Sequence, residues 1–426
     1  MTTRVAFVGM THLGLVSGSG AAAKGFETIC YDPDAALIAR LQKGELPVLE
    51  PDLDDLVAKN GARQVFTADP KALRTCSVVY IAPDVPTDDA GGSDLSGIRA
   101  LIDSVLPYLN PNAILVVLCQ VPPGFTRSLP LPADRLYYQV ETLIFGRAVE
   151  RTLQPERFIV GCADPDAALP ADFATLLQAY GCPILPMRYE SAELAKISIN
   201  MCLVASISVA NTLAELCEKI GAAWHEIVPA LKLDRRIGPY SYLAPGLGIA
   251  GGNLERDLRT VIAFSRQHDT DAGVVEAWIA NSKRRRNWAA KTIRGLLAAL
   301  PADPLLAVWG LAYKENTHSV KNSPSLATLA QLQDVRVRLH DPVVPGEKAG
   351  HPRAQIAATA LAALDGADIL AILTPWPEYA GVKPAEIAGR MRGRILLDPY
   401  RIMDARAVHA AGLDYYTLGM PPLIAN

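Results

Sequence analysis

The N-terminal residues place a glycine-containing turn between a short apolar strand and a helix of small residues. Val5–Val8 is the predicted strand, Gly9–Gly14 is the turn, and Leu15–Lys24 is the predicted helix. A second predicted strand, Thr28–Tyr31, then ends at Asp32. This order of strand, turn, helix, strand and acid is typical of the βαβ unit that opens a dinucleotide-binding domain.

The turn predicts contacts with a dinucleotide, although its glycine pattern is incomplete. Thr11 stands where the usual pattern has its second glycine, at the point where the backbone approaches the pyrophosphate. Asp32 is placed to accept hydrogen bonds from a ribose diol, and no basic residue adjoins it, which favours NAD over NADP. A βαβ unit that binds nothing is the alternative. The predicted cofactor-binding residues here are Gly9, Thr11, His12, Leu13, Gly14 and Asp32.

Further apolar runs predict buried parallel strands in both halves of the chain. They are Val78–Ala82, Ala113–Leu118, Tyr137–Gly146 and Phe158–Gly161 in the first half, and Pro304–Trp309, Val335–His340, Ile369–Leu373 and Ile395–Asp398 in the second. The predicted fold is therefore α/β, with two doubly wound halves bridged by helices. Ligands of such sheets bind at the carboxyl ends of the strands. We expect Pro86, Thr87 and Gln120 near the cofactor for that reason, and Glu141 on the loop side of its strand.

The residues Ser191–Gly221 predict one long helix, and Val274–Leu300 predicts a second helical region. Lys196 and Asn200 are four residues apart, so they share one face of the first helix, and Asn211 lies close to that face. A solvated stripe is the alternative interpretation of these polar side chains.

The stretch Pro245–Asp257 concentrates glycines just before a predicted helix. Glycine permits positive φ and close approach of a ligand, and the first amides of a helix point at whatever lies before it. A glycine-rich surface turn is the alternative interpretation.

Composition narrows the classes of partner. A chain of 426 residues predicts two or three domains. The net charge is −3, and the dense basic run is Lys283–Arg286, so we expect no nucleic acid partner. We interpret that run as a solvated face or a subunit contact in preference to a phosphate patch.

The seven cysteines occur singly with no C-x-x-C pair, which indicates no zinc site and fits a reducing compartment. No leader segment with charged residues followed by an apolar run precedes Val5, and we expect no apolar run long enough to span a membrane. We therefore expect a soluble, cytoplasmic protein with no metal and no membrane partner.

Taken together, the motifs resemble those of the UDP-glucose/GDP-mannose dehydrogenase family over nearly the whole chain. The matching residues are Val8–Leu15, Leu49–Pro51, Val85–Thr87, Val121-Pro122 with Gly124, Glu141, Ala192–Lys196 with Asn200 and Asn211, Asp234–Gly238, Gly246–Asp257, Gly310–Lys314 with Asn316-Thr317, Ser323-Pro324, Asp341-Pro342, and Thr374 with Trp376. The resemblance implies an NAD-binding domain at residues 1–187, a central helical dimerisation region at 188–300 and a nucleotide-sugar-binding α/β domain at 301–426.

The resemblance also implies roles for individual residues. Glu141, Lys196, Asn200 and Asp257 match positions of the family's catalytic site. The implied substrate-binding residues are Arg236, Tyr242, Gly248, Lys314 and Lys321. In the family, the arginine at the position of Arg236 usually reaches in from the partner subunit of a homodimer. Lys321 stands where the family usually has an arginine.

The departures from the family pattern lie at positions that the family uses for catalysis. Asn253 stands where the family has the cysteine whose thiolate captures an aldehyde and leads to a uronic acid, and an amide has no equivalent nucleophile. Gln120 replaces a threonine, Arg256 replaces a lysine, and Val140, Thr142, Ile144 and Phe145 have lost the usual pattern around Glu141.

We therefore predict an NAD-dependent enzyme that removes one hydride from a nucleotide-activated sugar and stops at a keto or aldehyde product. Lys196, or Glu141 through a water, would take the hydroxyl proton, Asn200 and Asn253 would donate to the developing carbonyl oxygen, and Asp257 would orient a water or Lys196. The alternatives are a redox-neutral epimerase or dehydratase with resident NAD and a keto intermediate, and a non-catalytic nucleotide-sugar-binding paralogue.

Overall fold

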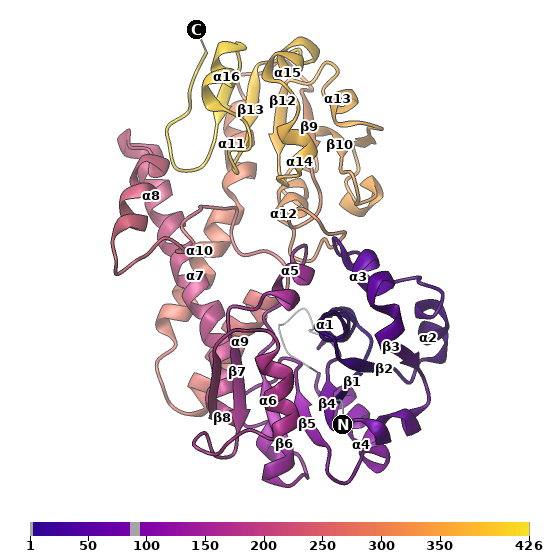
Figure 1. Ribbon diagram of the computed structural model, residues 1–426. Helices are drawn as coiled ribbons and strands as arrows, with labels where there is room; N and C mark the ends of the chain where they lie inside the picture. The colour runs from indigo at the N-terminus through magenta and orange to yellow at the C-terminus, as the bar shows by residue number, and fades with distance from the viewer. Residues whose placement is uncertain (1–2, 86–93, 426) are drawn as a thin grey trace. The chain divides into compact units, whose positions relative to one another are not determined.

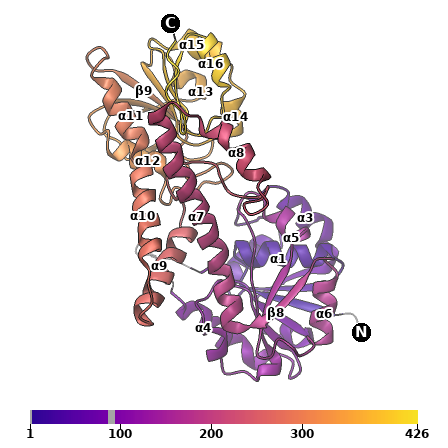
Figure 2. The same ribbon diagram turned by 90° about the vertical axis from the view of Figure 1, so that its left-hand side faces the viewer.

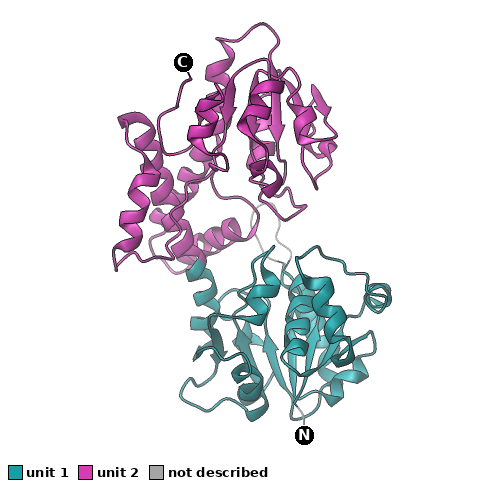
Figure 3. Ribbon diagram, turned by 45° about the horizontal axis from the view of Figure 1, so that its top comes forward, with its two compact units in different colours: residues 1–199 teal, residues 200–426 magenta. Residues whose placement is uncertain are grey.

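The computed structural model describes residues 3–85 and 94–425 and divides into two compact units, residues 1–199 and 200–426 (Figure 3). Each unit is built on its own β-sheet with helices packed against it (Figure 1). The predicted α/β class is confirmed. The domain boundaries at residues 187 and 300 stay a prediction.

The sheet of the first unit has the strand order β3-β2-β1-β4-β5-β6-β7-β8. All neighbouring strands are parallel except β6 and β7, which are antiparallel. The order 3-2-1-4-5-6 is that of a dinucleotide-binding fold, with its switch point between β1 and β4. The strands are β1 Arg4–Val8, β2 Glu27–Tyr31, β3 Gln64–Thr67, β4 Val78–Ile81, β5 Ile114–Val117, β6 Leu136–Gln139, β7 Phe158–Cys162 and β8 Ile184–Arg188.

Helices of small and apolar residues complete this unit. Gly18 in the first helix lets that helix lie close to the sheet, since a Cβ there would meet the Cys30 sulfur at 3.0 Å. The helices are α1 His12–Ala23, α2 Ala35–Leu41, α3 Leu53–Asn60, α4 Ser96–Val105, α5 Ala148–Leu153, α6 Ala171–Gln178 and the start of α7 Tyr189–Ile220. The division between the units falls within α7.

The sheet of the second unit is parallel throughout and has the order β11-β10-β9-β12-β13-β14. Renumbered from its first strand, this order is again 3-2-1-4-5-6. The strands are β9 Leu305–Trp309, β10 Arg336–His340, β11 Ala354–Ile356, β12 Ile369–Ile372, β13 Ile395–Leu397 and β14 Asp414–Tyr416. The helices are the rest of α7, α8 Trp224–Leu233, α9 Asn253–Gln267, α10 Gly273–Arg286, α11 Trp288–Leu297, α12 Pro324–Ala330, α13 Ala360–Ala363, α14 Pro377–Ala380, α15 Pro384–Arg390 and α16 Ala405–Ala410.

The two sheets use the same device after their first strand. Gly9 follows β1 and Gly310 follows β9, and both have a φ of 96°. The next amide then donates to an aspartate at the end of the adjacent strand: Met10 N to Asp32 at 2.7 Å, and Leu311 N to Asp341 at 2.6 Å. The prediction of two Rossmann-like domains is therefore confirmed, and the second repeats the glycine turn of the first.

Two predicted segments differ from the structure. The strand predicted over Tyr137–Gly146 ends at Gln139, because the following backbone turns away to meet side chains of other segments. The helical region predicted over Val274–Leu300 is two helices that meet at Asn287. Strands β3, β8, β11 and β14 were not predicted, since three of them are short edge or near-edge strands and β8 is partly exposed.

Helix α7 has the length and apolar composition of a membrane-spanning helix. The prediction that no apolar run reaches that length was therefore wrong. A core helix of a soluble protein has the same properties, and Glu193 and Lys196 of α7 are paired with other residues of the first unit.

Candidate active site

The nucleotide turn of the first unit is built around glycine. Gly9 has a positive φ, and a Cβ at Gly14 would lie 1.9 Å from the Gly9 carbonyl oxygen, so that α1 reaches the turn through glycine. The Thr11 hydroxyl accepts no capping hydrogen bond from the amides of α1; it accepts from the Asp84 amide at 2.7 Å. The missing glycine is thus replaced by a link between the turn and the loop after β4.

Asp32 lies at the carboxyl end of β2, where the predicted ribose contact requires it. Its Oδ2 accepts from the Met10 amide and its Oδ1 accepts from the Asp34 amide at 2.9 Å. The carboxylate is thereby fixed beside the turn, and the residues present fit NAD. Gln120 follows β5 at the same edge of the sheet. Pro86 and Thr87 lie outside the described residues.

His12 and Leu13, the first residues of α1, are buried. His12 Nε2 lies 3.0 Å from Glu50 Oε2, and its ring stacks on Phe145 with centroids 4.2 Å apart. Glu50 also accepts from the amides of Gly146 and Ala148 at 3.0 and 2.8 Å. Glu50 therefore ties the nucleotide turn to the segment that follows Glu141.

Lys196 and Glu141 form an ion pair inside the first unit. The Lys196 Nζ lies 2.6 Å from Glu141 Oε1 and donates to the Glu141 carbonyl oxygen at 3.0 Å. The other carboxylate oxygen, Oε2, accepts from the Leu143 amide at 3.0 Å. The side chains are 13% and 17% exposed, so the pair is shielded from bulk water yet accessible to a ligand.

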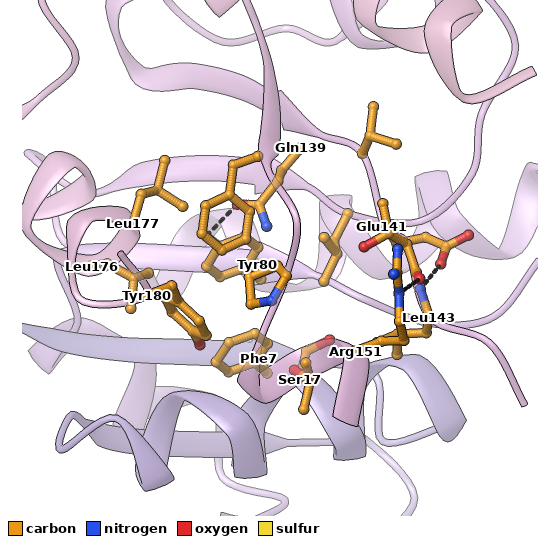
Figure 4. Close-up of a pocket in the computed structure, with 16 residues that line it drawn as sticks. Phe7, Ser17, Tyr80, Gln139, Glu141, Leu143, Arg151, Leu176, Leu177 and Tyr180 are labelled. Carbon is orange, nitrogen blue, oxygen red and sulfur yellow. Dashed lines mark hydrogen bonds between the residues drawn. The ribbon is translucent and has the colours of Figure 1, made fainter. Parts of the chain in front are cut away.

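A cavity of about 50 Å³ lies behind Glu141 (Figure 4). Tyr80, Gln139 and Arg151 contribute polar groups to it, and the Tyr80 hydroxyl donates to Gln139 at 2.7 Å. A cavity of this size holds water and no sugar. Glu141 is therefore bordered on this side by a small chamber with both polar and apolar walls.

Asn200 and Asp257 meet in the second unit. The Asn200 Nδ2 donates to Asp257 Oδ2 at 2.5 Å, and the Arg256 Nε lies 3.2 Å from Asp257 Oδ1. Asp257 is 1% exposed and Arg256 is 5% exposed. Both carboxylate oxygens of Asp257 are thus engaged by side chains of the protein.

Asn253 is exposed and is the first residue of α9. The segment before it is fixed from several sides, which explains its glycines. Gly248 has a φ of 81°, and a Cβ there would lie 2.5 Å from the Ser282 carbonyl oxygen of α10. Asn211 on α7 accepts from the Gly246 amide at 2.9 Å. At least part of the close approach that the glycines predicted is therefore made by α10, which packs against the backbone of this loop.

Lys321 lies against the same loop. A Cβ at Gly252 would be 3.8 Å from Lys321 Nζ, and Asn322 donates to the Gly251 carbonyl oxygen at 2.8 Å. Lys314 Nζ lies 5.8 Å from the ring centroid of Tyr313, which packs over Gly251. A cation thus stands beside the N-terminus of α9, where a helix attracts negative charge.

Arg236 and Tyr242 are exposed and lie in the segment between α8 and α9. The Arg236 side chain is 89% exposed, and it pairs with Asp234 at 2.7 Å. Tyr242 is 55% exposed. Their predicted role in substrate binding stays a prediction.

Several residues of the site were not predicted as such. Glu193 is buried on α7 and accepts from the amides of Gly124 and Thr126 at 2.6 and 2.8 Å, and burial raises the pKa of its carboxyl. Asp341 receives the amides that follow β9. Glu50, Glu193 and Asp341 stand within motifs quoted above, and an acidic residue in such a motif is the signal that would have identified them.

The seven cysteines, all of them described, are free thiols. In the second unit, Cys217 is buried among Ala214, Trp224 and Leu243, and Cys202 is exposed two residues from Asn200, so it does not share that face of α7. In the first unit, burial raises the pKa of the Cys119 thiol to about 12.

Comparison with known proteins agrees with this architecture. Three models of the UDP-glucose/GDP-mannose dehydrogenase family match the chain: the NAD binding domain at residues 3–180, the central domain at 190–283 and the UDP binding domain at 307–405. These are consecutive and leave few residues outside.

Individual relatives match over nearly their full length. The chain is 30% identical to a UDP-glucose 6-dehydrogenase of Pseudomonas aeruginosa, covering 98% of both chains. It is 29% identical to the UDP-glucose 6-dehydrogenase TuaD of Bacillus subtilis, covering 98% of this chain and 93% of the relative. A UDP-glucose dehydrogenase structure from Pyrobaculum islandicum superposes with a TM-score of 0.84 at 25% identity, covering 99% and 98%. The chain is thus an NAD-binding, dehydrogenase-like enzyme that belongs to the UDP-glucose/GDP-mannose dehydrogenase family.

Proposed function

We propose that the protein oxidises a nucleotide-activated sugar by a single hydride transfer to NAD and releases a keto or aldehyde product without forming the acid. The observation that carries this proposal is Asn253 at the start of α9. That position opens the helix, and Lys321 Nζ lies 3.8 Å from a Cβ placed on the preceding residue, Gly252, a setting that would favour a thiolate. An amide there can donate a hydrogen bond to an oxygen, but it cannot form the covalent adduct from which a second oxidation proceeds.

Proton removal falls to the Lys196–Glu141 pair. Lys196 Nζ lies 2.6 Å from Glu141 Oε1, so both groups can act on one substrate hydroxyl. A substrate hydroxyl that delivers its proton to this pair, directly or through one water, then becomes a carbonyl oxygen. Asn200 and Asn253 are the amides proposed to donate to that oxygen.

The surroundings of Asp257 also favour a reaction that stops early. A carboxylate that activates water for hydrolysis needs an open oxygen and access to water. The Asp257 oxygens are engaged by Asn200 and Arg256, and the side chain is buried. We therefore assign Asp257 to orientation of Asn200.

A redox-neutral epimerase or dehydratase is the second candidate. A carbonyl acidifies the neighbouring C–H bond, and the Lys196–Glu141 pair is suited to move that proton as well. A non-catalytic paralogue is disfavoured, since a binding site alone does not need a shielded lysine–carboxylate pair.

We also propose a homodimer and a cytoplasmic location. Helix α7 exposes a stripe of large apolar side chains: Val209, Leu213, Leu216 and Ile220. Their spacing places them along one side of the helix, as expected for an interface with a second copy. All seven cysteines are free thiols, which fits a reducing compartment.

The test is the ratio of NADH to product with a panel of UDP- and GDP-sugars, with products identified by mass spectrometry. One NADH per keto or aldehyde product is expected. Product without net NADH would support the epimerase or dehydratase. Two NADH per carboxylate product would overturn the proposal. The protein would then carry out the four-electron oxidation that the family resemblance implies.

A further inference from the structure

A second cavity lies wholly within the second unit, away from the glycine-rich loop, and has a volume of about 290 Å³. The C-terminal part of α7 forms one wall, and the end of α10 with the start of α11 forms the other. Figure 2 shows the course of these helices. Four cationic side chains and two carboxylates line it, together with Trp288 and Thr292. The cavity therefore carries two more positive than negative charges.

Arg285 is the buried element of this wall. Its side chain is 2% exposed, its Nη2 lies 2.8 Å from Glu218, and its Nη1 lies 3.8 Å from Glu215. The Arg285 Nε has no acceptor among the described residues, although it is buried. The interpretation of the Lys283–Arg286 run as a solvated face is thus wrong for Arg285, whose guanidinium is a buried cation of the cavity wall.

The carboxylates of the cavity are already engaged. Glu215 accepts from Arg284 through both of its oxygens, and Arg284 lowers the pKa of Glu215, with smaller contributions from Arg285 and Lys291. Glu218 accepts from Trp288 Nε1 at 3.2 Å and from the Gly419 amide at 3.0 Å, besides Arg285. The lysines of the cavity, Lys219 and Lys291, have no ion-pair partner among the described residues and supply the surplus charge.

We propose that this cavity binds a phosphoryl group, either as inorganic phosphate or as part of a small phosphorylated metabolite. The ammonium groups of Lys219 and Lys291 can donate to the oxygens of such a dianion, and its charge matches the surplus of two. A neutral ligand would leave that surplus uncompensated. The indole of Trp288 offers an apolar surface for the part that carries the phosphate.

The site is linked to the glycine-rich loop through α10. Ser282 and Arg286 flank the arginines of the cavity on that helix, and both contact Ile249: the Ile249 amide donates to Ser282 Oγ at 2.8 Å, and Arg286 donates to the Ile249 carbonyl oxygen at 2.5 Å. Occupancy of the cavity therefore acts on the helix that holds the loop leading to Asn253. This regulatory consequence rests on the proposed function, whereas the binding itself does not.

The test is calorimetric titration of the full-length protein with inorganic phosphate and, separately, with glucose 1-phosphate. We expect saturable binding that the double variant Lys219→Gln/Lys291→Gln weakens by about a hundredfold, since each lost charged hydrogen bond costs about tenfold. Lys283→Gln, an exposed lysine of the same run that does not line the cavity, should bind as the unmodified protein does. Glu215→Gln should bind more tightly, because it removes a repelling charge.

If the double variant still binds phosphate as the unmodified protein does, the phosphate binds elsewhere and the proposal is wrong. The proposal is also wrong if the unmodified protein is not saturated at phosphate concentrations up to about 10 mM, which corresponds to a binding free energy weaker than about 3 kcal/mol. Tighter binding of glucose 1-phosphate than of phosphate identifies a metabolite as the ligand, and equal binding identifies free phosphate. If the double variant fails to fold, the single variants carry the same comparison. Because no turnover is measured, a failed NADH assay leaves this outcome unaffected.

Discussion

The Lys196 ammonium contacts Glu141 twice, through the carboxylate at 2.6 Å and through the carbonyl oxygen at 3.0 Å. A side chain held by both groups of one residue has a fixed direction. The same residue, Glu141, is itself fixed by the Leu143 amide. The pair is therefore a preorganised group, and its position at the start of a loop makes it sensitive to what binds there.

Lys196→Ala should lower kcat at least about a hundredfold, since a positioned acid–base group contributes that much or more. Initial rates with a sugar found active in the NADH assay provide the measurement. NAD affinity should change little, because the turn at Gly9 is not altered. Lys59→Ala, at an exposed position on α3, is the matched control. Full turnover in Lys196→Ala would remove the pair from the mechanism.

The cysteines should be dispensable. Burial raises the pKa of Cys119 from 9.0 to about 12, so at pH 8 the thiol is protonated and does not react. Iodoacetamide at pH 8 should label exposed Cys202 first and leave Cys119 unlabelled until the protein unfolds. Cys119→Ala should retain turnover. A tenfold loss in that variant without a loss of stability would show that a thiol takes part.

The protein should bind NAD at least about thirtyfold more tightly than NADP. The reason is that repulsion between the fixed Asp32 carboxylate and the 2′-phosphate of NADP weakens the binding free energy by on the order of 2 kcal/mol. Fluorescence titration with NADH and NADPH measures the ratio. Asp32→Ala should weaken NADH binding and narrow the difference. Asp54→Asn, at an exposed position of α3, should leave the ratio unchanged. Equal binding of both cofactors by the unmodified protein would contradict the assignment of Asp32.

The apolar stripe of α7 should hold the dimer. Leu213→Glu with Leu216→Glu places two charges in it, and light scattering after gel filtration should then show a monomer. Leu185→Glu, an equally exposed leucine in β8, should leave the mass unchanged. A monomeric unmodified protein, or an unaltered dimer in the double variant, would contradict the assignment.

Both sheets could be predicted because their central strands are continuous apolar runs bounded by glycine or acid. Val5–Val8 and Pro304–Trp309 are examples, and β1 and β9 occupy these residues. Strands such as β11 are short and partly exposed, so no apolar run marks them. The strand predicted beyond Gln139 failed for another reason: Glu50, distant in sequence, draws the Gly146 and Ala148 amides out of the sheet.

The candidate site was predictable in its parts and not in its pairings. The spacing of Lys196 and Asn200 gave a shared helix face, but no pattern shows that Lys196 pairs with Glu141 or that Asn200 pairs with Asp257. Arg256 was recognised as a substitution, yet its contact with Asp257 needs the packed structure, since both side chains are buried. Pairings of this kind depend on tertiary packing.

Restoring a thiol by Asn253→Cys should create a reactive cysteine and still yield little acid. The first turn of α9 and the nearby Lys321 ammonium favour a thiolate, so iodoacetamide at pH 7 should modify Cys at this position faster than it modifies Cys202. Intact mass spectrometry should then show a covalent adduct with an aldehyde product. Turnover to the acid should remain low, because Asp257 stays buried and engaged by Asn200 and Arg256. Asn253→Ser, which restores shape without a thiolate, should give no adduct. If Asn253→Cys instead released two NADH per carboxylate, the hydrolytic apparatus would be intact, and the orienting role assigned to Asp257 would be wrong.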